Sequence, residues 1–305
     1  MRISEYTGFL QQFGIIYTLK EIYYRFFNNI LENIVYLRRD KDTFRYLKRY
    51  LVNIQKVHCT PVPLKNLKPC IWTCWLQGYE NAPPVVKTCI DSMRKHSGNH
   101  EVIIITEKNI NEYVLMPEYI MEKFRKGIIP VAHFSDLLRT LLLINYGGIW
   151  IDATVFLSDN IPENILKSDF FVFQNSALQV NFQPCSSWFI VANKNNCILT
   201  GVFAVLSEYW KKNNYLIHYF LFHIALKFVI TNLPEASELW NRMFYKNNSD
   251  PHYLQKILFR GSDTDIWNHI LDLSFAHKLT YKFTDNSMTE VCGTFYQNIT
   301  KTLSE

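Results

Sequence analysis

The chain has 305 residues, a length that corresponds to one large or two small domains. Hydrophobic residues make up 48% and charged residues 19% of the sequence, which excludes a disordered chain or a fibre. The net charge of +5 belongs to residues 1–56, which hold ten Lys and Arg against five Asp and Glu. A neutral body with one basic end argues against a nucleic-acid-binding protein and favours contact with an anionic surface.

Cysteine usage and hydropathy indicate where the chain resides. The seven cysteines are scattered, without C-x-x-C or zinc-finger spacing, which predicts reduced thiols in a cytoplasmic protein. The first fifty residues mix charged with apolar side chains and do not read as a signal peptide. The longest apolar run, 216–230, contains two histidines and a lysine and is shorter than the roughly 20 residues of a membrane span. We expect neither export by a signal peptide nor a transmembrane helix.

The N-terminal segment, residues 1–60, is predicted to be helical. Apolar residues recur in pairs one turn apart over 19–35, and after a charged break at 38–42 a second helix, 44–54, has an apolar face opposite a basic one. Two roles of these helices are possible and do not exclude each other. The helices can pack on the main body, or they can lie on an anionic membrane surface as basic, aromatic-rich helices do.

Beyond a proline-rich linker at 60–69, the order of elements predicts an α/β fold over residues 61–305. The apolar run 70–76 is typical of a buried strand, Pro84 begins a helix, and the β-branched run 102–105 is typical of a strand covered on both faces. Strand, helix and strand in this order form a βαβ unit. We therefore expect a mostly parallel sheet flanked by helices.

The remaining elements follow the same logic. A helix over 132–145 is predicted to end at Gly147 and Gly148, where a left-handed cap is expected, and to lead into a strand at 149–151. Apolar runs and periodicity predict strands at 170–173 and 188–192, and helices at 197–210, 216–230, 234–245 and 264–273.

Acidic and basic side chains converge around the strand at 149–151. Asp136 and Arg139 are three residues apart on the preceding helix and face the same side, which by itself favours a simple salt bridge. Asp152 follows the strand, and ligands of open α/β sheets bind at the carboxyl ends of strands. Thr154 points the same way as Asp152 in an extended segment. Such a place suits a hard cation such as Mg²⁺ or Mn²⁺.

The run SDLLR…NYGGIWIDAT, with IWTCWLQGYENAPPVV upstream, resembles the capsular polysaccharide synthesis protein family, which is related to glycosyltransferases with a DXD sugar-binding motif. The resemblance covers about residues 69–162 and includes several motifs in the right order. It implies a GT-A type, Rossmann-like fold and the transfer of a sugar from a nucleotide diphosphate donor, with retention of the anomeric configuration.

The resemblance also implies roles for the donor-binding residues. Trp72 corresponds to an aromatic residue that stacks on uracil, whereas Trp75 is expected in the core. Asp136 and Arg139 correspond to residues that bind the donor sugar and phosphate oxygens. Gln77 is expected to line the same crevice or to cap its loop.

The implied metal site departs from the DXD pattern. Asp152 corresponds to the acid that contacts the ribose and the metal, but Thr154 replaces the second acid. His277 is a candidate third ligand, and Lys278 and Lys282 are candidates to neutralise the leaving diphosphate, unless these three are ordinary residues of a late strand. A Mn²⁺ or Mg²⁺ completed by the diphosphate, a loosely held Mg²⁺, and metal-independent catalysis with basic residues all remain open.

We expect a cytoplasmic glycosyltransferase on the inner face of the cell membrane that moves a hexose from a UDP-sugar to a lipid-linked oligosaccharide in bacterial capsular or surface polysaccharide synthesis. Residues 1–56 would hold it on anionic lipids, and no nucleic acid is expected as a partner. Two alternatives remain. One is a non-catalytic sugar-nucleotide-binding or scaffolding subunit, motivated by Thr154, and the other is a sugar-phosphate transferase.

Overall fold

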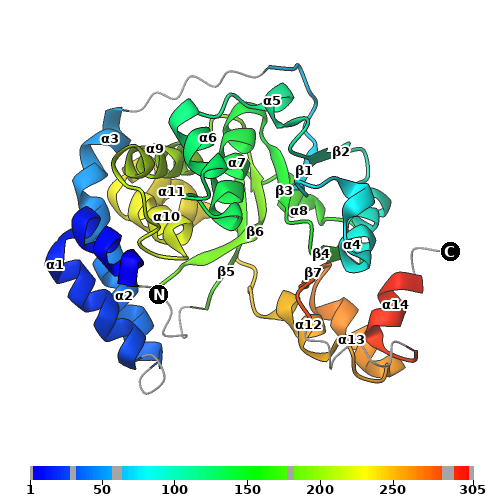
Figure 1. Cartoon of the computed structure of the whole chain (residues 1–305). Coiled ribbons are helices and arrows are strands. Elements are labelled where there is room, and N and C mark those ends of the chain that lie inside the picture. The colour runs from blue at the N-terminus through cyan, green and yellow to red at the C-terminus, as the bar shows by residue number, and fades with distance from the viewer. Residues whose placement is uncertain (1–2, 28–31, 57–63, 177–181, 284–291, 302–305) are drawn as a thin grey trace.

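The computed structural model describes residues 3–27, 32–56, 64–176, 182–283 and 292–301. A five-stranded sheet with the order β2-β1-β3-β6-β5 lies at its centre, with helices on both faces (Figure 1). The five strands are β1 Ile71–Cys74, β2 Val102–Ile105, β3 Gly148–Ile151, β5 Phe170–Gln174 and β6 Cys185–Ala192. β1 is parallel to β2 and β3, and β6 is antiparallel to β3 and β5, so only β6 runs against the others. The expected mostly parallel α/β sheet is confirmed.

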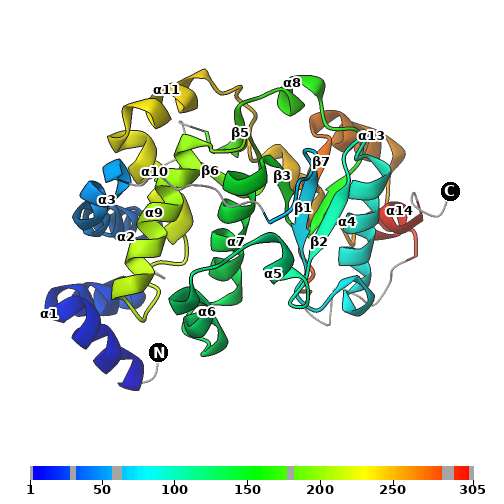
Figure 2. The ribbon, with the colours of Figure 1, turned by 90° about the horizontal axis from the view of Figure 1, so that it is seen from above.

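The helices form two groups around this sheet. Viewed from above, α4 (Pro84–Lys95) and the C-terminal helices lie on one side, and the helices from α6 to α11 lie on the other, except for α8 (Figure 2). The second group comprises α6 Glu118–Arg125, α7 Val131–Tyr146, α9 Cys197–Lys212, α10 Leu221–Asn232 and α11 Pro234–Arg242. The remaining helices of the body are α5 Ile110–Tyr113, α8 Glu163–Leu166, α12 Tyr253–Ile257, α13 Thr264–Leu273 and α14 Phe295–Lys301, with 3₁₀ turns at Tyr79–Asn81 and Asp250–His252.

Several boundaries differ from the expected ones. β2 is an edge strand, so Val102 and Ile104 are only half-buried, and the expectation that both faces are covered is wrong. The helix expected from residue 216 begins at Leu221, because the ring of His218 accepts the backbone N–H of Phe220 and closes a turn. The helix expected to reach residue 245 ends at Arg242, and β6 begins three residues earlier than expected.

A two-glycine turn joins α7 to β3. Gly147 and Gly148 have φ values of +70° and +94°, which glycine adopts without strain. A Cβ on Gly148 would lie 2.4 Å from the carbonyl oxygen of Cys70. The glycine therefore allows β3 to enter the sheet directly beside β1, where the N–H of Ile149 donates to the same carbonyl.

A second, two-stranded sheet was not predicted. β4 (Val155–Leu157) pairs antiparallel with β7 (Ala276–Lys278), with Val155 opposite Lys278. The N–H of Leu279 also donates to the carbonyl oxygen of Thr154, at 2.8 Å. This pairing returns the late part of the chain to the segment that follows β3.

The N-terminal helices are α1 (Ile3–Phe27), α2 (Glu32–Leu47) and α3 (Leu51–Lys56), with a 3₁₀ turn at Lys48–Tyr50. The expected charged break at 38–42 is wrong because α2 runs through it, and residues 28–31, inside the first expected helix, lie outside the described residues. Two acids of α2 have close partners: Asp42 accepts from Lys20 and Tyr24 of α1, and Asp40 lies 3.0 Å from His218.

The N-terminal helices share the core of the body. Phe13, Tyr46 and Tyr50 are buried in the same cluster as side chains of α9 and α10. The expected boundary at residue 60 lies outside the described residues. Within the described ranges, no helix combines the length and apolar character that a membrane crossing requires.

Candidate functional site

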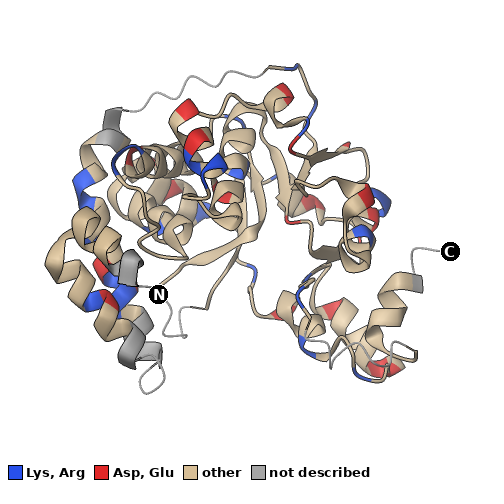
Figure 3. Cartoon of the chain, in the orientation of Figure 1, with Lys and Arg blue, Asp and Glu red and all other residues tan. Residues whose placement is uncertain are grey.

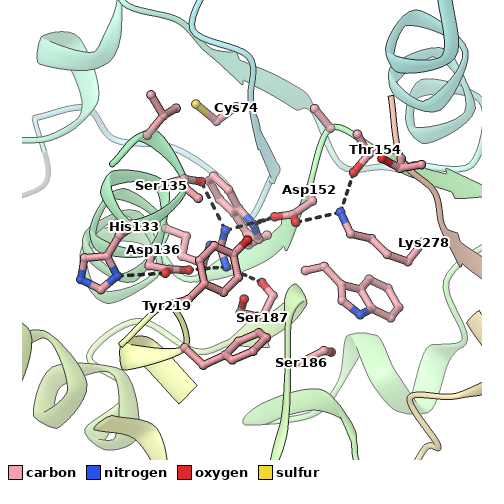
Figure 4. Close-up of a pocket in the computed structure, with 18 of the residues that line it drawn as sticks. Cys74, His133, Ser135, Asp136, Asp152, Thr154, Ser186, Ser187, Tyr219 and Lys278 are labelled. Carbon is pink, nitrogen blue, oxygen red and sulfur yellow. Dashed lines mark hydrogen bonds and ion pairs between the residues drawn. The ribbon is translucent and has the colours of Figure 1, made fainter. Parts of the chain in front are cut away.

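A pocket of about 880 Å³ opens at the carboxyl ends of β1 and β3. Its walls come from α7, the segment after β3, the start of β6, the loop before α10 and the segment around β7 (Figure 4). This volume lies within the range of small-molecule sites, which is typically 300–1,000 Å³. All the predicted site residues except Trp72 and His277 line this pocket.

Four charged side chains form a continuous chain of ion pairs along one wall. Arg139 lies 2.9 Å from Asp136 through Nη1 and 3.2 Å from Asp152 through Nη2. The other carboxylate oxygen of Asp152 lies 3.1 Å from Nζ of Lys278. Figure 4 shows Asp136, Asp152 and Lys278 pointing toward one another. We call Asp136, Arg139, Asp152 and Lys278 the pocket cluster. The structure thus joins the expected pair on α7 to the acid after β3, and adds a lysine 126 residues further along.

The guanidinium of Arg139 is fixed from several sides. It donates to the carbonyl oxygen of Ser187 at 2.9 Å and to Oγ of Ser135 at 3.3 Å, and it lies 5.0 Å from the centre of the Trp150 ring. Only 4% of Arg139 is exposed. A planar cation held in this way keeps a fixed orientation.

The two acids of the cluster are also fully engaged. Asp136 contacts Arg139 with one oxygen and Nδ1 of His133 with the other, at 3.2 Å. Asp152 accepts the indole N–H of Trp150 at 2.8 Å. Burial acts to raise the pKa of Asp152, but the charges of Lys278 and Arg139, with the indole N–H, outweigh it and hold the pKa below its ordinary value of 3.8. Asp152 is therefore a carboxylate at neutral pH.

The three residues expected to hold a metal, Asp152, Thr154 and His277, do not all come together. The side chain of His277 lies outside the pocket, fully buried on the opposite face of β7 from Lys278, where Nε2 contacts Oγ of Ser158 at 3.0 Å. Alternation of side chains along a strand explains why the prediction that His277 is a ligand is wrong. Asp152 and Thr154 do lie together, but Nζ of Lys278 donates to both.

This donor set does not suit a divalent cation. It offers one carboxylate and one hydroxyl, with an ammonium already between them. Within the described ranges, no group of three or more His, Cys, Asp and Glu side chains is arranged to bind a metal ion. Mg²⁺ and Mn²⁺ favour several oxygen ligands of higher charge.

The tryptophan expected to stack on a base is in the core instead. Trp72 is fully buried, its indole N–H donates to the carbonyl oxygen of Gly147 at 3.0 Å, and its ring packs against Tyr113 and Tyr146. No ring face is free for a ligand, so that prediction is wrong. Trp75, expected in the core, is half-buried, lines the pocket and meets Tyr281 edge to face at 5.1 Å.

Gln77 and Lys282 are exposed side chains of the pocket, as expected for residues that line it. The sequence reasoning missed the opposite wall. There Trp188 donates its indole N–H to Oδ1 of Asn248 at 3.0 Å and meets His252 edge to face. Burial, aided by the charges of Lys278 and Lys256, lowers the pKa of His252. Asn248 and His252 belong to no local motif, and the available signal was the position of Trp188 at the start of a predicted strand.

Comparisons with known proteins show similarity to glycosyltransferases. The chain is 25% identical over 156 residues to the O-glycosyltransferase braB of Annulohypoxylon truncatum, covering 46% of this chain and 37% of that protein. It is 26% identical over 102 residues to the O-glycosyltransferase PaGT of Phomopsis amygdali, covering 30% of this chain and 25% of that protein. The chain thus spans well under half the length of these relatives. The solved structure of the PaToxG glycosyltransferase superposes on this chain with a TM-score of 0.40 and 14% sequence identity. The superposition covers 86% of this chain and 95% of the PaToxG chain.

A family match covers most of the chain. The family described as capsular polysaccharide synthesis protein matches residues 23–299. The match includes the pocket cluster and extends the resemblance at 69–162 in both directions. This chain belongs to the capsular polysaccharide synthesis protein family.

Proposed function

We propose that the chain is a glycosyltransferase that moves a hexosyl group from a UDP-sugar to a hydroxyl group of a lipid-linked oligosaccharide, in capsular or surface polysaccharide synthesis. The pocket cluster is the observation that carries this proposal. It places fixed cations and carboxylates at the carboxyl ends of two parallel strands, where α/β sheets bind nucleotides. The names of the two relatives support glycosyl transfer, and the family description supports a place in polysaccharide synthesis.

The lining residues suggest how a donor is held. Trp75 and Tyr281 offer aromatic surface for the uracil near the pocket mouth, in place of Trp72. Lys278 and Lys282 lie on the same side as Tyr281 and supply positive charge for the diphosphate. Donor sugar hydroxyls would meet the inner end of the cluster near Asp136, and the acceptor would enter along the wall of Trp188 and His252.

Retention of the anomeric configuration is part of the proposal. The carboxylates among the described lining residues are Asp136 and Asp152, and both are paired with cations. Burial raises the pKa of the Cys74 thiol to about 12, so it stays protonated. None of these three groups is therefore placed as a free nucleophile that could attack the anomeric carbon. We infer that the acceptor attacks the face from which the leaving group departs.

The bond changes balance without an enzyme nucleophile. The bond between the anomeric carbon and the diphosphate oxygen breaks, and that oxygen keeps the electron pair. The acceptor oxygen forms the new bond to the anomeric carbon, and its proton passes to the departing phosphate. The cations of the pocket stabilise the charge that develops on the leaving group.

Donor hydrolysis tests the activity. Purified protein offered a panel of UDP-sugars should release UDP, and Asp152→Ala should lower the rate by about two to three orders of magnitude, as loss of a preorganised electrostatic group does. Release of UMP would indicate a sugar-phosphate transferase. If the protein binds the nucleotide but shows no donor hydrolysis that depends on Asp152, the scaffolding subunit is favoured.

A matched pair of tryptophan variants tests the base site. Trp75→Ala should weaken UDP binding by roughly tenfold, because base stacking on an aromatic side chain contributes about 1–3 kcal/mol. Trp72→Phe removes the hydrogen bond to Gly147 and should lower the free energy of unfolding, with UDP affinity unchanged. Equal UDP affinity of Trp75→Ala and wild type in calorimetry would exclude this base site.

The exposed face of α1 supports association with a membrane surface. Ile15, Ile16, Leu19, Ile22 and Tyr23 follow helical spacing and are 37–67% exposed. On the same helix, Phe13 is buried in the cluster shared with the body, and Tyr24 is buried and donates its hydroxyl to Asp42 of α2. Figure 3 shows basic residues interspersed with acidic ones over the N-terminal helices. An apolar face beside basic residues is typical of helices that lie in an anionic interface.

Point variants test the membrane proposal better than a deletion, because the N-terminal helices share the core. Ile16→Asp combined with Leu19→Asp should reduce sedimentation with phosphatidylserine vesicles and leave donor hydrolysis intact. Leu115→Asp is the matched control, since Leu115 is 64% exposed on the main body. If the α1 variant and the control bind vesicles as well as wild type does, α1 is not the membrane contact.

A further inference from the structure

The ammonium of Lys278 occupies the place between the two residues that were expected to hold a metal. Nζ lies 3.1 Å from Oδ2 of Asp152 and also donates to Oγ1 of Thr154. An ammonium has three N–H donors. Within the described part of the chain, these two oxygens are its hydrogen-bond partners, which leaves one donor for a ligand in the pocket.

Charge balance matches this arrangement. A divalent cation between two carboxylates leaves a neutral group, and so does a monovalent ammonium beside one carboxylate and one hydroxyl. The threonine at position 154, in place of an acid, therefore pairs with a lysine in place of a metal. A second carboxylate at 154 would leave the site with one uncompensated negative charge, which would repel a diphosphate.

The backbone holds Lys278 in this position. β7 pairs with β4 in a register that sets Lys278 opposite Val155, the residue after Thr154. His277 anchors the other face of β7 through Ser158. Only 20% of the Lys278 side chain is exposed, so the charge acts in a partly desolvated site where it is weakly screened.

We propose that Lys278 takes the place of the divalent cation in this enzyme. Its ammonium joins Asp152 to Thr154 and binds the donor diphosphate, so that donor binding and transfer require no metal. This inference rests on the proposed function. As the bond from the anomeric carbon to the diphosphate breaks, the leaving oxygen keeps the electron pair, and the fixed positive charge of Lys278 stabilises it.

Calorimetry with UDP tests the inference. Wild type should bind UDP equally well with EDTA and with Mn²⁺. Lys278→Ala should bind UDP about tenfold to a hundredfold more weakly in EDTA, because a buried charge partner is lost. Lys256→Ala is the matched control: it removes an exposed lysine of α12 and should leave UDP affinity unchanged.

A charge exchange makes the test specific. Lys278→Ala combined with Thr154→Asp provides two carboxylates and removes the ammonium. This double variant should bind Mn²⁺ alone, as seen by electron paramagnetic resonance, and should recover UDP affinity only with Mn²⁺ present. Wild type should bind no Mn²⁺ at this site. Circular dichroism identifies a variant that has not folded, and Lys278→Met then replaces Lys278→Ala.

The outcomes distinguish a failure of the proposed role of Lys278 from a failure of the proposed glycosyltransferase function. UDP binding by wild type that falls at least tenfold in EDTA would overturn the role of Lys278 and leave the proposed function standing. The same holds if wild type binds Mn²⁺ as tightly as the double variant does. No nucleotide binding under any condition would overturn the proposed function, and this inference with it.

Discussion

Two groups of ion pairs in this chain each share a carboxylate between two cations, yet they are built in opposite ways. One is the pocket cluster. The other, here called the N-terminal cluster, joins α1 to α2 and comprises Lys20, Tyr24, Asp42 and Arg45. In the N-terminal cluster the acid is at the buried centre, with 11% of the Asp42 side chain exposed, and the cations reach toward solvent. In the pocket cluster the cation Arg139 is the buried centre, with 5% of its side chain exposed.

This difference shows what each cluster can do. A cation that reaches into water is strongly screened, so the N-terminal cluster can contribute to helix packing but offers little to a ligand. A cation fixed in a partly desolvated pocket acts with little screening and needs no reorganisation when a ligand arrives. The position of the cation therefore distinguishes a binding cluster from a structural one in the same molecule.

The largest effect is expected at the centre of the pocket cluster. Arg139→Met leaves Asp136 and Asp152 with too few partners and should lower the free energy of unfolding by about 3–5 kcal/mol, as breaking a buried ion pair does. Donor hydrolysis should be lost as well. Urea unfolding gives the stability change. An unaltered unfolding midpoint would show that Arg139 is not the buried centre of the cluster.

The dependence of stability on pH should also separate the two regions. Burial lowers the pKa of His277 from 6.5 to about 4, so the unfolded chain binds a proton between these values and the folded chain does not. Stability should therefore fall as the pH drops from about 6.5 to 4, by on the order of 3 kcal/mol from this group. The His277→Gln variant should lack the part of this loss of stability between pH 6.5 and 4 that protonation of His277 causes. If wild type and variant follow parallel curves over this range, burial does not keep His277 neutral.

The N-terminal cluster should respond at lower pH. Burial acts to raise the pKa of Asp42, but hydrogen bonds from Lys20 and Tyr24 outweigh it and hold the pKa below 3.8. The stability that Asp42 contributes is present above its unfolded pKa and is lost as the pH falls through its lower folded pKa. Asp42→Asn should cost about 2 kcal/mol at pH 7, typical of hydrogen bonds to a charged group, and less at pH 3.

The smallest effect is expected at the edge of the N-terminal cluster. The Arg45 side chain is 67% exposed, so Arg45→Ala should change the free energy of unfolding by under about 1 kcal/mol. Neither Asp42→Asn nor Arg45→Ala should alter UDP affinity. A tenfold loss of UDP affinity in either variant would show that the two clusters are coupled.

Local signals predicted much of the fold. Pro84 is at the first turn of α4 and Gly147 ends α7, as the sequence suggests. These features depend on residues close in the chain. The acids of the site were predicted for the same reason, since Asp136 and Asp152 are separated only by one helix and one short strand.

Long-range pairing was beyond local reasoning. Lys278 meets Asp152 only because β7 pairs with β4, and neither three-residue strand has a distinctive pattern. The exchange of roles between Trp72 and Trp75 has a similar cause. Both lie within one apolar run, and the partner rings Tyr113 and Tyr281 that decide which face is covered come from distant segments.

The close approach at Gly148 links backbone packing to the chemistry of the pocket. Because a Cβ there would collide with the carbonyl of Cys70, any other residue would push β3 away from β1. Asp152 comes four residues later, directly after β3, while Arg139 is anchored on α7 before the turn. A single methyl group at Gly148 would thus pull the acid and the guanidinium apart. The glycine, which contacts no ligand, sets the spacing on which the site depends.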